Sequence, residues 1–222
     1  MSNINLLCIE AFICLVMLLI VYRKWKIEGL YIYIIINFIL SNIMSLKMIE
    51  IYNFDINLGI IPFATVFIAS NIIIQKKGRD EIKQLVLILI GTTIVSYAIL
   101  YLTKLMDSST INLFTNKSYD NILNNSPRLY FANIVTMLYT LLINSKLYYS
   151  LKKIKNKIWI SNLFTSIIIQ FIASTAFPIL AYALIKEPVE IVKLVIIRYM
   201  ISLIVSIIGT FIIYIANKVK ID

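Results

Sequence analysis

Long apolar runs dominate the sequence and limit what the chain can fold into. Seven such runs follow one another, each about 20 residues long, which is the length of helix that crosses about 30 Å of hydrocarbon. Hydrophobic residues make up 60% of the 222 residues and charged residues 14%, whereas a typical soluble domain is about a quarter charged. Such a chain needs lipid to cover the apolar surface that it cannot bury. We therefore expect an integral membrane protein with no room for a soluble catalytic domain.

Lipid requires each run to be helical, because an unpaired backbone group in hydrocarbon costs several kcal/mol. The predicted fold class is all-α: a polytopic transmembrane bundle that forms a single membrane domain, with a lipid bilayer as its surroundings. Pro178 is expected to kink the sixth helix, and Pro62 to mark or bend the start of the third. The predicted spans cover residues 4–22, 29–49, 58–75, 85–103, 127–151, 159–185 and 191–216.

The first run has neither the basic start nor the small-residue cleavage site of a secretory signal, so we expect it to remain as a membrane anchor. It carries both cysteines, Cys8 and Cys14, which lie six positions apart and so cannot meet across one helix. We interpret them as packing residues rather than as a disulfide.

The formal net charge of +10 is best explained as a signal for membrane topology. Of the 21 Lys and Arg residues, 14 fall after the first, third and fifth runs or in the C-terminal tail. The positive-inside rule therefore predicts an external N-terminus and a cytoplasmic C-terminus in the cytoplasmic membrane. Trp25 and Trp159 fall at the same predicted boundary, where aromatic anchors are common. Because the cations form short clusters between apolar runs, nucleic-acid binding is not expected.

Several chemical functions are disfavoured by residues that the chain lacks. Histidine is absent, which removes the commonest general base and metal ligand. The sequence also has no phosphate-binding Walker loop, no HExxH zinc motif, no GxSxG nucleophile elbow and no cluster of acids. We expect neither an enzyme nor a bound metal or cofactor.

Ionisable residues inside spans are costly enough to be functional candidates. Glu10 and Arg198 are predicted to lie at similar depths, about 10 Å below the outer surface, given the rise of about 1.5 Å per helical residue. They either form a buried ion pair or present opposite charges to a ligand. Arg128, at the outer start of the fifth span, either extends to lipid headgroups or reaches a ligand.

A second set of candidates consists of amides within the spans. They either enclose a polar site for an uncharged heterocycle or hold helices together by hydrogen bonds worth about 0.6 kcal/mol each. These amides are Asn37, Asn42, Asn71, Gln75, Asn133, Asn144 and Gln170.

A series of short motifs resembles the queuosine precursor transporter (VUT) family of bacterial inner-membrane proteins, over about residues 29–217. The N-terminal motifs are Ser41-Asn42-Ile43, Leu46-Lys47, Glu50, Phe67-Ile68-Ala69-Ser70-Asn71 and the loop 78–86. The later motifs are Arg128 with Ala132, Leu151-Lys152-Lys153, Trp159, Asn162, Thr165-Ser166, Gln170, Phe177, and Arg198 in place of a family lysine. The resemblance implies import of a 7-deazaguanine base or nucleoside through a six-helix core, to which the first helix is an addition.

The chain departs from this family where the family has acids. Asn71, Gln75 and Asn144 stand at positions that are acidic in the family, and Ala173-Ser174 replaces an Asp-Thr pair. These departures remove the groups expected to hold a cationic amine or to carry a coupling proton. The resemblance therefore implies a divergent member that binds a neutral relative of the usual substrate or works without proton coupling.

The sequence thus predicts a carrier for a 7-deazaguanine or similar purine-like molecule. Two alternatives remain open: a substrate-binding membrane subunit of an ATP-driven transporter, and a non-transporting divergent paralogue. A homo-oligomer or a coupling subunit is a further possible partner. Phe67 and Phe177 are candidates for stacking on a flat base. The predicted substrate-binding residues are Asn42, Asn71, Gln75, Arg128, Asn144, Gln170 and Arg198, with Glu10 and Arg198 as an ionic element.

Overall fold

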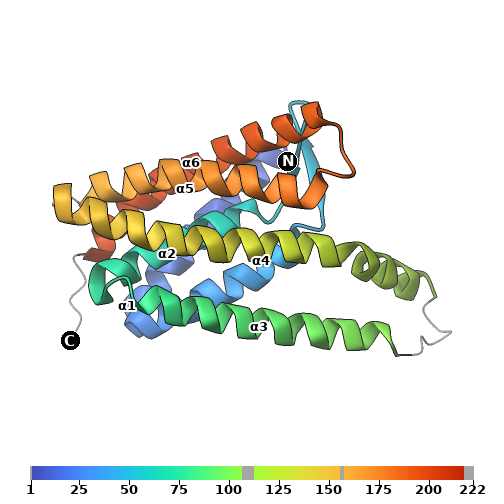
Figure 1. Cartoon of the computed structure of the whole chain (residues 1–222), viewed down its shortest axis with the longest axis horizontal. Helices are drawn as coiled ribbons and strands as arrows, with labels where there is room; N and C mark the ends of the chain where they lie inside the picture. Colours follow the sequence, from blue (N-terminus) through green and yellow to red (C-terminus); the bar gives the residue numbers. More distant parts are fainter. Residues whose placement is uncertain (1, 107–112, 156–157, 218–222) are drawn as a thin grey trace.

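The computed structural model describes residues 2–106, 113–155 and 158–217, and it is a bundle of long helices (Figure 1). The predicted all-α transmembrane bundle is confirmed as the fold class. One short antiparallel hairpin interrupts the helices. The elements are α1 (Asn3–Met44), β1 (Met48–Ile51), β2 (Phe54–Asn57), α2 (Ile60–Lys77), α3 (Glu81–Lys104), α4 (Leu113–Lys155), α5 (Ile158–Tyr182) and α6 (Pro188–Asn217).

Helix α1 contains the first predicted span and most of the second, and it reverses direction at Lys26. This residue has a non-helical backbone, with φ of 52° and ψ of −131°. The two halves pack antiparallel against each other. The Tyr33 hydroxyl in the second half donates a 3.0 Å hydrogen bond to the Cys14 carbonyl in the first. Gly29 allows this approach, since a Cβ there would lie 2.7 Å from the Val21 carbonyl oxygen. The first span is therefore half of a helical hairpin.

The link between α1 and α2 differs from the prediction. The second span was expected to reach residue 49, but the helix ends at Met44 and the following residues form β1 and β2. Ile51 pairs with Phe54, and the two residues between them, Tyr52 and Asn53, both have positive φ. Two consecutive positive φ values are the signature of a type I′ turn, which suits the twist of a tight hairpin.

The later helices extend beyond most of their predicted limits. Helix α4 begins at Leu113 and contains Pro127, so part of the stretch between the fourth and fifth predicted spans is helical. Residues 107–112 of that stretch lie outside the described residues. Pro62 falls in the first turn of α2, where its missing N–H removes no helical hydrogen bond, and Pro178 lies inside α5 close to its end. Helix α5 ends at Tyr182 rather than at residue 185.

Helix α2 forms the centre of the bundle (Figure 1). All its residues from Ile60 to Ile74 are buried, and it packs against α1, α4 and α6. A helix that is apolar on all sides is stable only when others surround it. The contact with α6 is close at Gly209, where a Cβ would meet the Ile68 side chain at 2.1 Å.

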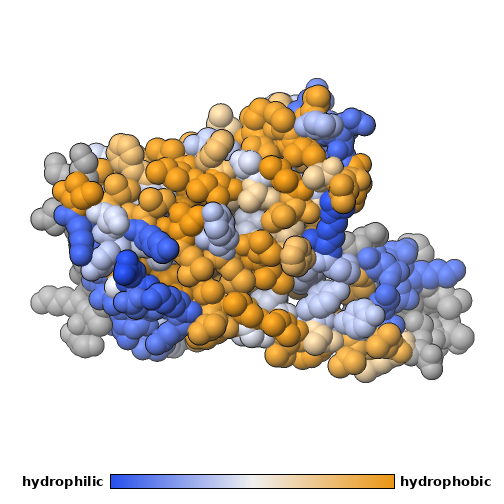
Figure 2. All heavy atoms as spheres, viewed as in Figure 1, coloured by the Kyte–Doolittle hydropathy of each residue, from blue (hydrophilic) through white to orange (hydrophobic). Residues whose placement is uncertain are grey.

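The outside of the bundle is apolar between two more polar ends (Figure 2). Large hydrophobic side chains such as Phe12, Leu87 and Phe211 are about 70% exposed on the isolated chain, as expected where lipid covers them. Helices α1, α2, α3, α5 and α6 are long and apolar enough to cross a membrane.

The two ends of the bundle carry different segments (Figure 1). We call one the basic end; it holds the reversal of α1 at Lys26, the α2–α3 connection and the C-terminal end of α4. We call the other the hairpin end; it holds β1, β2 and the α5–α6 connection. Lys76, Lys77, Arg79, Lys152 and Lys153 are at the basic end, in agreement with the clustering seen in the sequence.

Candidate functional site

Three buried amides and a threonine hydroxyl form a hydrogen-bonded chain across four helices, in the half of the bundle nearer the basic end. Asn144 on α4 donates a 2.7 Å hydrogen bond to the Oδ1 of Asn71 on α2. Asn71 donates at 2.7 Å to Asn162 on α5, and Asn162 donates at 2.7 Å to the Thr210 hydroxyl on α6. The three amides are at most 1% exposed. We call this set, Asn144–Asn71–Asn162–Thr210, the amide chain.

The interface between α5 and α6 continues the polar contacts toward the hairpin end. Gln170 Nε2 donates to the Ser206 hydroxyl at 2.9 Å, and the Ser174 and Ser202 hydroxyls lie 3.4 Å apart. These pairs and Asn162–Thr210 recur at steps of one or two helical turns, so they share one face of each helix. From Asn162 to Ser174 they extend over about 18 Å, a large part of the thickness of a bilayer core. We call this series the α5–α6 ladder.

Helix α4 supplies a buried polar stripe along the same interior. Its members are three or four residues apart and so face one side of the helix. The stripe consists of Asn133, Thr136, Thr140, Asn144 and Tyr148, all buried. At its hairpin end, Asn133 Nδ2 donates to the Oδ1 of Asn42 at 3.0 Å and to the Ser41 hydroxyl at 3.1 Å, which ties α4 to α1.

Several atoms in this interior are buried without a hydrogen-bond partner in the described structure. They include the Oε1 of Gln170 and the Oδ1 of both Asn133 and Asn144. An unpaired buried acceptor costs about 1–3 kcal/mol, so most folded proteins avoid it. Groups that are only half satisfied by the fold are suited to binding the edge of a polar ligand.

Arg198 lies between aromatic rings rather than beside an acid. Its guanidinium carbon is 4.2 Å from the centre of the Phe177 ring and 5.7 Å from that of Phe63. No ion pair joins it to Glu10 among the described residues, and the Oε1 of Glu10 is buried without a partner. The first of the two sequence interpretations, a buried Glu10–Arg198 pair, is therefore wrong, because similar depth did not place the two side chains on facing surfaces.

Arg128 and Gln75 lie away from the amide chain. Arg128 is partly buried, and its Nε donates to the Leu180 carbonyl near the end of α5 at 3.4 Å. Gln75 is partly buried at the basic end, where its backbone carbonyl accepts a 3.0 Å hydrogen bond from Lys152. The structure thus brings together Asn71 and Asn144, adds Gln170 through the α5–α6 ladder, and places Asn42 in the separate contact with Asn133.

The sequence analysis missed the residues that connect the amides. Asn162 was noted only as part of the family resemblance, yet it joins Asn71 to Thr210. Ser206 and Thr210 were not singled out, because serine and threonine are common in membrane helices and their spacing alone does not show which neighbour they face. The signal that was available is the spacing of Asn162 and Gln170, which is two helical turns on one face of α5.

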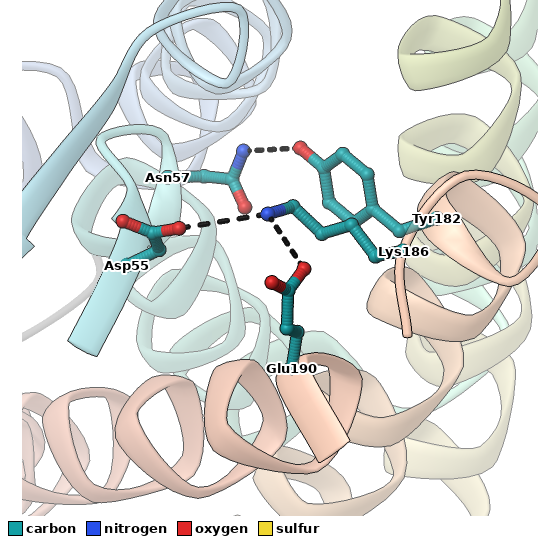
Figure 3. A network of polar contacts seen from close by, with 5 residues as sticks. All are labelled: Asp55, Asn57, Tyr182, Lys186 and Glu190. Atoms are coloured by element: carbon teal, nitrogen blue, oxygen red, sulfur yellow. Dashed lines mark hydrogen bonds and ion pairs between the residues drawn. The ribbon is translucent and has the colours of Figure 1, made fainter. Parts of the chain in front are cut away.

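A polar network lies at the hairpin end of the bundle (Figure 3). The ammonium of Lys186, between α5 and α6, lies 3.5 Å from Asp55 on β2 and 3.3 Å from Glu190 on α6. Beside it, Asn57 on β2 donates a 2.7 Å hydrogen bond to the Tyr182 hydroxyl at the end of α5. These contacts fasten the hairpin to the α5–α6 connection.

The charge of Lys186 predicts a pH-dependent contribution to stability. Burial lowers its pKa, but the hydrogen bond and charge of Glu190 and the charge of Asp55 outweigh this and raise the pKa above its ordinary value. The folded state therefore favours the ammonium, so the contribution is complete below about pH 10.4 and is lost as pH rises further. We expect Lys186→Gln to lower the free energy of unfolding by less than about 1 kcal/mol at pH 7, because the partners are half exposed. Thermal unfolding of the original protein and of Lys186→Gln from pH 7 to 11 measures this contribution. A difference in stability between the two that did not shrink at high pH would contradict the prediction.

The described surface also has an apolar groove of about 560 Å³ between the two halves of α1. It is lined by residues such as Met17, Trp25 and Ile32, which are about half exposed. None of the predicted substrate-binding residues lines it. The groove thus lies apart from the amide chain and the α5–α6 ladder, although the candidate amide Asn37 lines it.

Comparison with known proteins places the chain in a family. The model of the family described as "Putative vitamin uptake transporter" matches residues 57–216, which include all of α2–α5 and nearly all of α6, and with them the amide chain and the α5–α6 ladder. The match begins after the region around residue 29 where the motif resemblance was expected to start. No curated protein and no solved structure matches the chain. Because the match covers more than half of the sequence, the chain belongs to the vitamin uptake transporter family.

Proposed function

We propose that this protein imports a queuosine precursor, or a related 7-deazaguanine, across the cytoplasmic membrane. The family supports uptake of a vitamin-like small molecule, and the choice of a 7-deazaguanine rests on the motif resemblance. The observation that carries the proposal is the amide chain, because in it Asn71 is hydrogen-bonded to Asn144 on one side and to Asn162 on the other, which joins three buried amides from three helices.

Buried amides suit a guanine-like heterocycle. An amide offers both a donor and an acceptor, and the edge of such a base requires both. In the amide chain each Nδ2 is used, whereas the Oδ1 of Asn144 has no partner, and in the α5–α6 ladder the Oε1 of Gln170 has none. These acceptors match the N–H and NH₂ donors on a guanine-like edge.

The placement of the polar groups supports transport rather than chemistry. The α5–α6 ladder extends over about 18 Å of the membrane interior, from the Asn162–Thr210 pair that it shares with the amide chain toward the hairpin network. Movement of α5 and α6 relative to α2 and α4 would expose this interior alternately to the two sides. We propose that the hairpin end is external and the basic end cytoplasmic, following the positive-inside rule.

Direct measurement of the uptake of labelled 7-deazaguanines, rather than of cell growth, tests the proposal. We expect a host that cannot make or import queuosine precursors to acquire uptake, and modified transfer RNA, when it expresses this chain. The same ligand should accumulate in vesicles that contain only the purified protein. Binding without accumulation in such vesicles would instead support a substrate-binding subunit of a larger transporter. Neither binding nor uptake of any 7-deazaguanine would contradict the proposed substrate.

A further inference from the structure

Arg198 is a buried cation whose hydrogen-bonding capacity the fold does not satisfy. It is 1% exposed, and it is the one charged residue among the buried polar side chains of residues 2–106, 113–155 and 158–217. Its Nε and Nη1 are buried without a hydrogen-bond partner. Two donors of a full positive charge are therefore left unmatched inside the membrane domain.

The aromatic contacts do not offset this cost. Phe177 and Phe63 hold the guanidinium by cation–π contacts at 4.2 Å and 5.7 Å. Such contacts are worth less than the penalty for burying an unpaired ion in a dry interior. No acid forms an ion pair with Arg198 in the described part of the chain. The described residues of the neighbouring helices therefore supply no negative charge that pairs with Arg198.

Arg198 lies where a substrate would pass. The Ser202 hydroxyl, one turn further along α6, donates to the Arg198 carbonyl at 2.8 Å and lies beside Ser174 in the α5–α6 ladder. On the other side, Phe177 packs edge-on against Tyr182, whose hydroxyl belongs to the network in Figure 3. Arg198 thus stands between the external network and the ladder.

We propose that Arg198 binds a carboxylate on the transported heterocycle, so that the preferred substrate is a planar anion. This inference rests on the proposed function and specifies its substrate class. Guanidinium pairs strongly with carboxylate, and the flanking Phe63 and Phe177 rings suit a flat ring system. A neutral ligand would leave the buried charge unbalanced, and a cationic one would repel it. Because Nε and Nη1 of Arg198 are buried in this structure, the anion can reach them only after the hairpin end of the bundle opens.

Three ligands that share one ring system and differ in the charge of one substituent test the proposal. The probes are 7-deazaguanines that carry at C7 a carboxylate, a nitrile or an aminomethyl group, measured by equilibrium binding to the full-length protein in lipid nanodiscs. We expect the carboxylate to bind about 10- to 100-fold more tightly than the nitrile, and the aminomethyl compound to bind most weakly. In Arg198→Met this advantage of the carboxylate should disappear.

Lys193→Met is the matched control, because it removes a cation from the exposed side of the same helix. It should leave the order of the three ligands unchanged. Thermal unfolding of Arg198→Met without ligand gives a second measurement, and we expect it to be at least as stable as the original protein, since an apolar side chain replaces an unpaired charge.

The outcomes separate the two proposals. Tightest binding of the nitrile or aminomethyl compound, or an unchanged order in Arg198→Met, would overturn the role of Arg198 and leave the proposed transport of 7-deazaguanines standing. A loss of stability in Arg198→Met together with an unchanged order would assign the guanidinium to helix packing. Binding of none of the three ligands would overturn both proposals.

Discussion

Replacing Gly59 with alanine is expected to lower the free energy of unfolding by about 2–3 kcal/mol, the upper part of the usual range for overpacking a core. Gly59 precedes α2, and a Cβ there would lie 2.2 Å from the Ser41 carbonyl oxygen and 2.3 Å from the Ser45 hydroxyl. The backbone of Gly59 has φ of −66°, which any residue can adopt, so the requirement for glycine is one of space. The end of α1 and the start of α2 would have to separate to admit a methyl group.

Gly91→Ala is the matched control for this prediction. Gly91 is exposed on α3, and a Cβ there would have no atom within 4 Å. Alanine stabilises a helix by about 0.5–1 kcal/mol relative to glycine, so this variant should be slightly more stable. Thermal unfolding of both variants in detergent measures the difference. Equal unfolding temperatures for the two would show that the close contact at Gly59 does not limit stability.

The fold was largely predictable because the membrane restricts it. Seven long apolar runs leave the backbone no option but helix in lipid, and each of them lies mostly within a helix. The hairpin of β1 and β2 was missed for two reasons. Met48–Ile51 is mostly apolar and continues the preceding run, and the turn residues Tyr52 and Asn53 lack the glycine that usually marks a type I′ turn.

The candidate site was predictable in its residue types and less so in its connections. Asn71, Asn144 and Gln170 were expected to be interior because amides are costly in lipid, and all three are buried. Depth and residue type do not determine which face of a helix meets which neighbour, however. For this reason Glu10 and Arg198 were placed at similar depths but do not pair, and the roles of Asn162 and Thr210 emerged only from the packing of α5 and α6.

Asn71 is the amide whose replacement should change function most. It accepts from Asn144 and donates to Asn162, both at 2.7 Å, so it joins α4 to α5 through the central helix. Asn71→Ala leaves the Oδ1 of Asn162 without this donor and removes an acceptor of Asn144. We expect it to lower the free energy of unfolding by about 1–3 kcal/mol and to abolish uptake. Uptake at low temperature, normalised to the folded protein in the membrane, separates the two effects.

Asn71→Asp restores at this position the acid that the wider family is expected to carry. The carboxylate has nearly the shape of the amide and still accepts from Asn144, but it cannot donate to Asn162 as the amide does. A half-turn of the Asn162 amide would present its Nδ2 to the carboxylate, so the fold should persist, while a negative charge is added to a buried site. We expect the ratio of affinities for the aminomethyl and carboxylate 7-deazaguanines to rise about tenfold or more, which corresponds to about 1.4 kcal/mol. Asn37→Asp makes the same change at a buried amide of α1 that bonds only within α1, and it should shift the ratio less. If both variants shifted the ratio equally, or if Asn71→Ala retained full uptake, the amide chain would be a structural link between helices and not part of the path taken by the substrate.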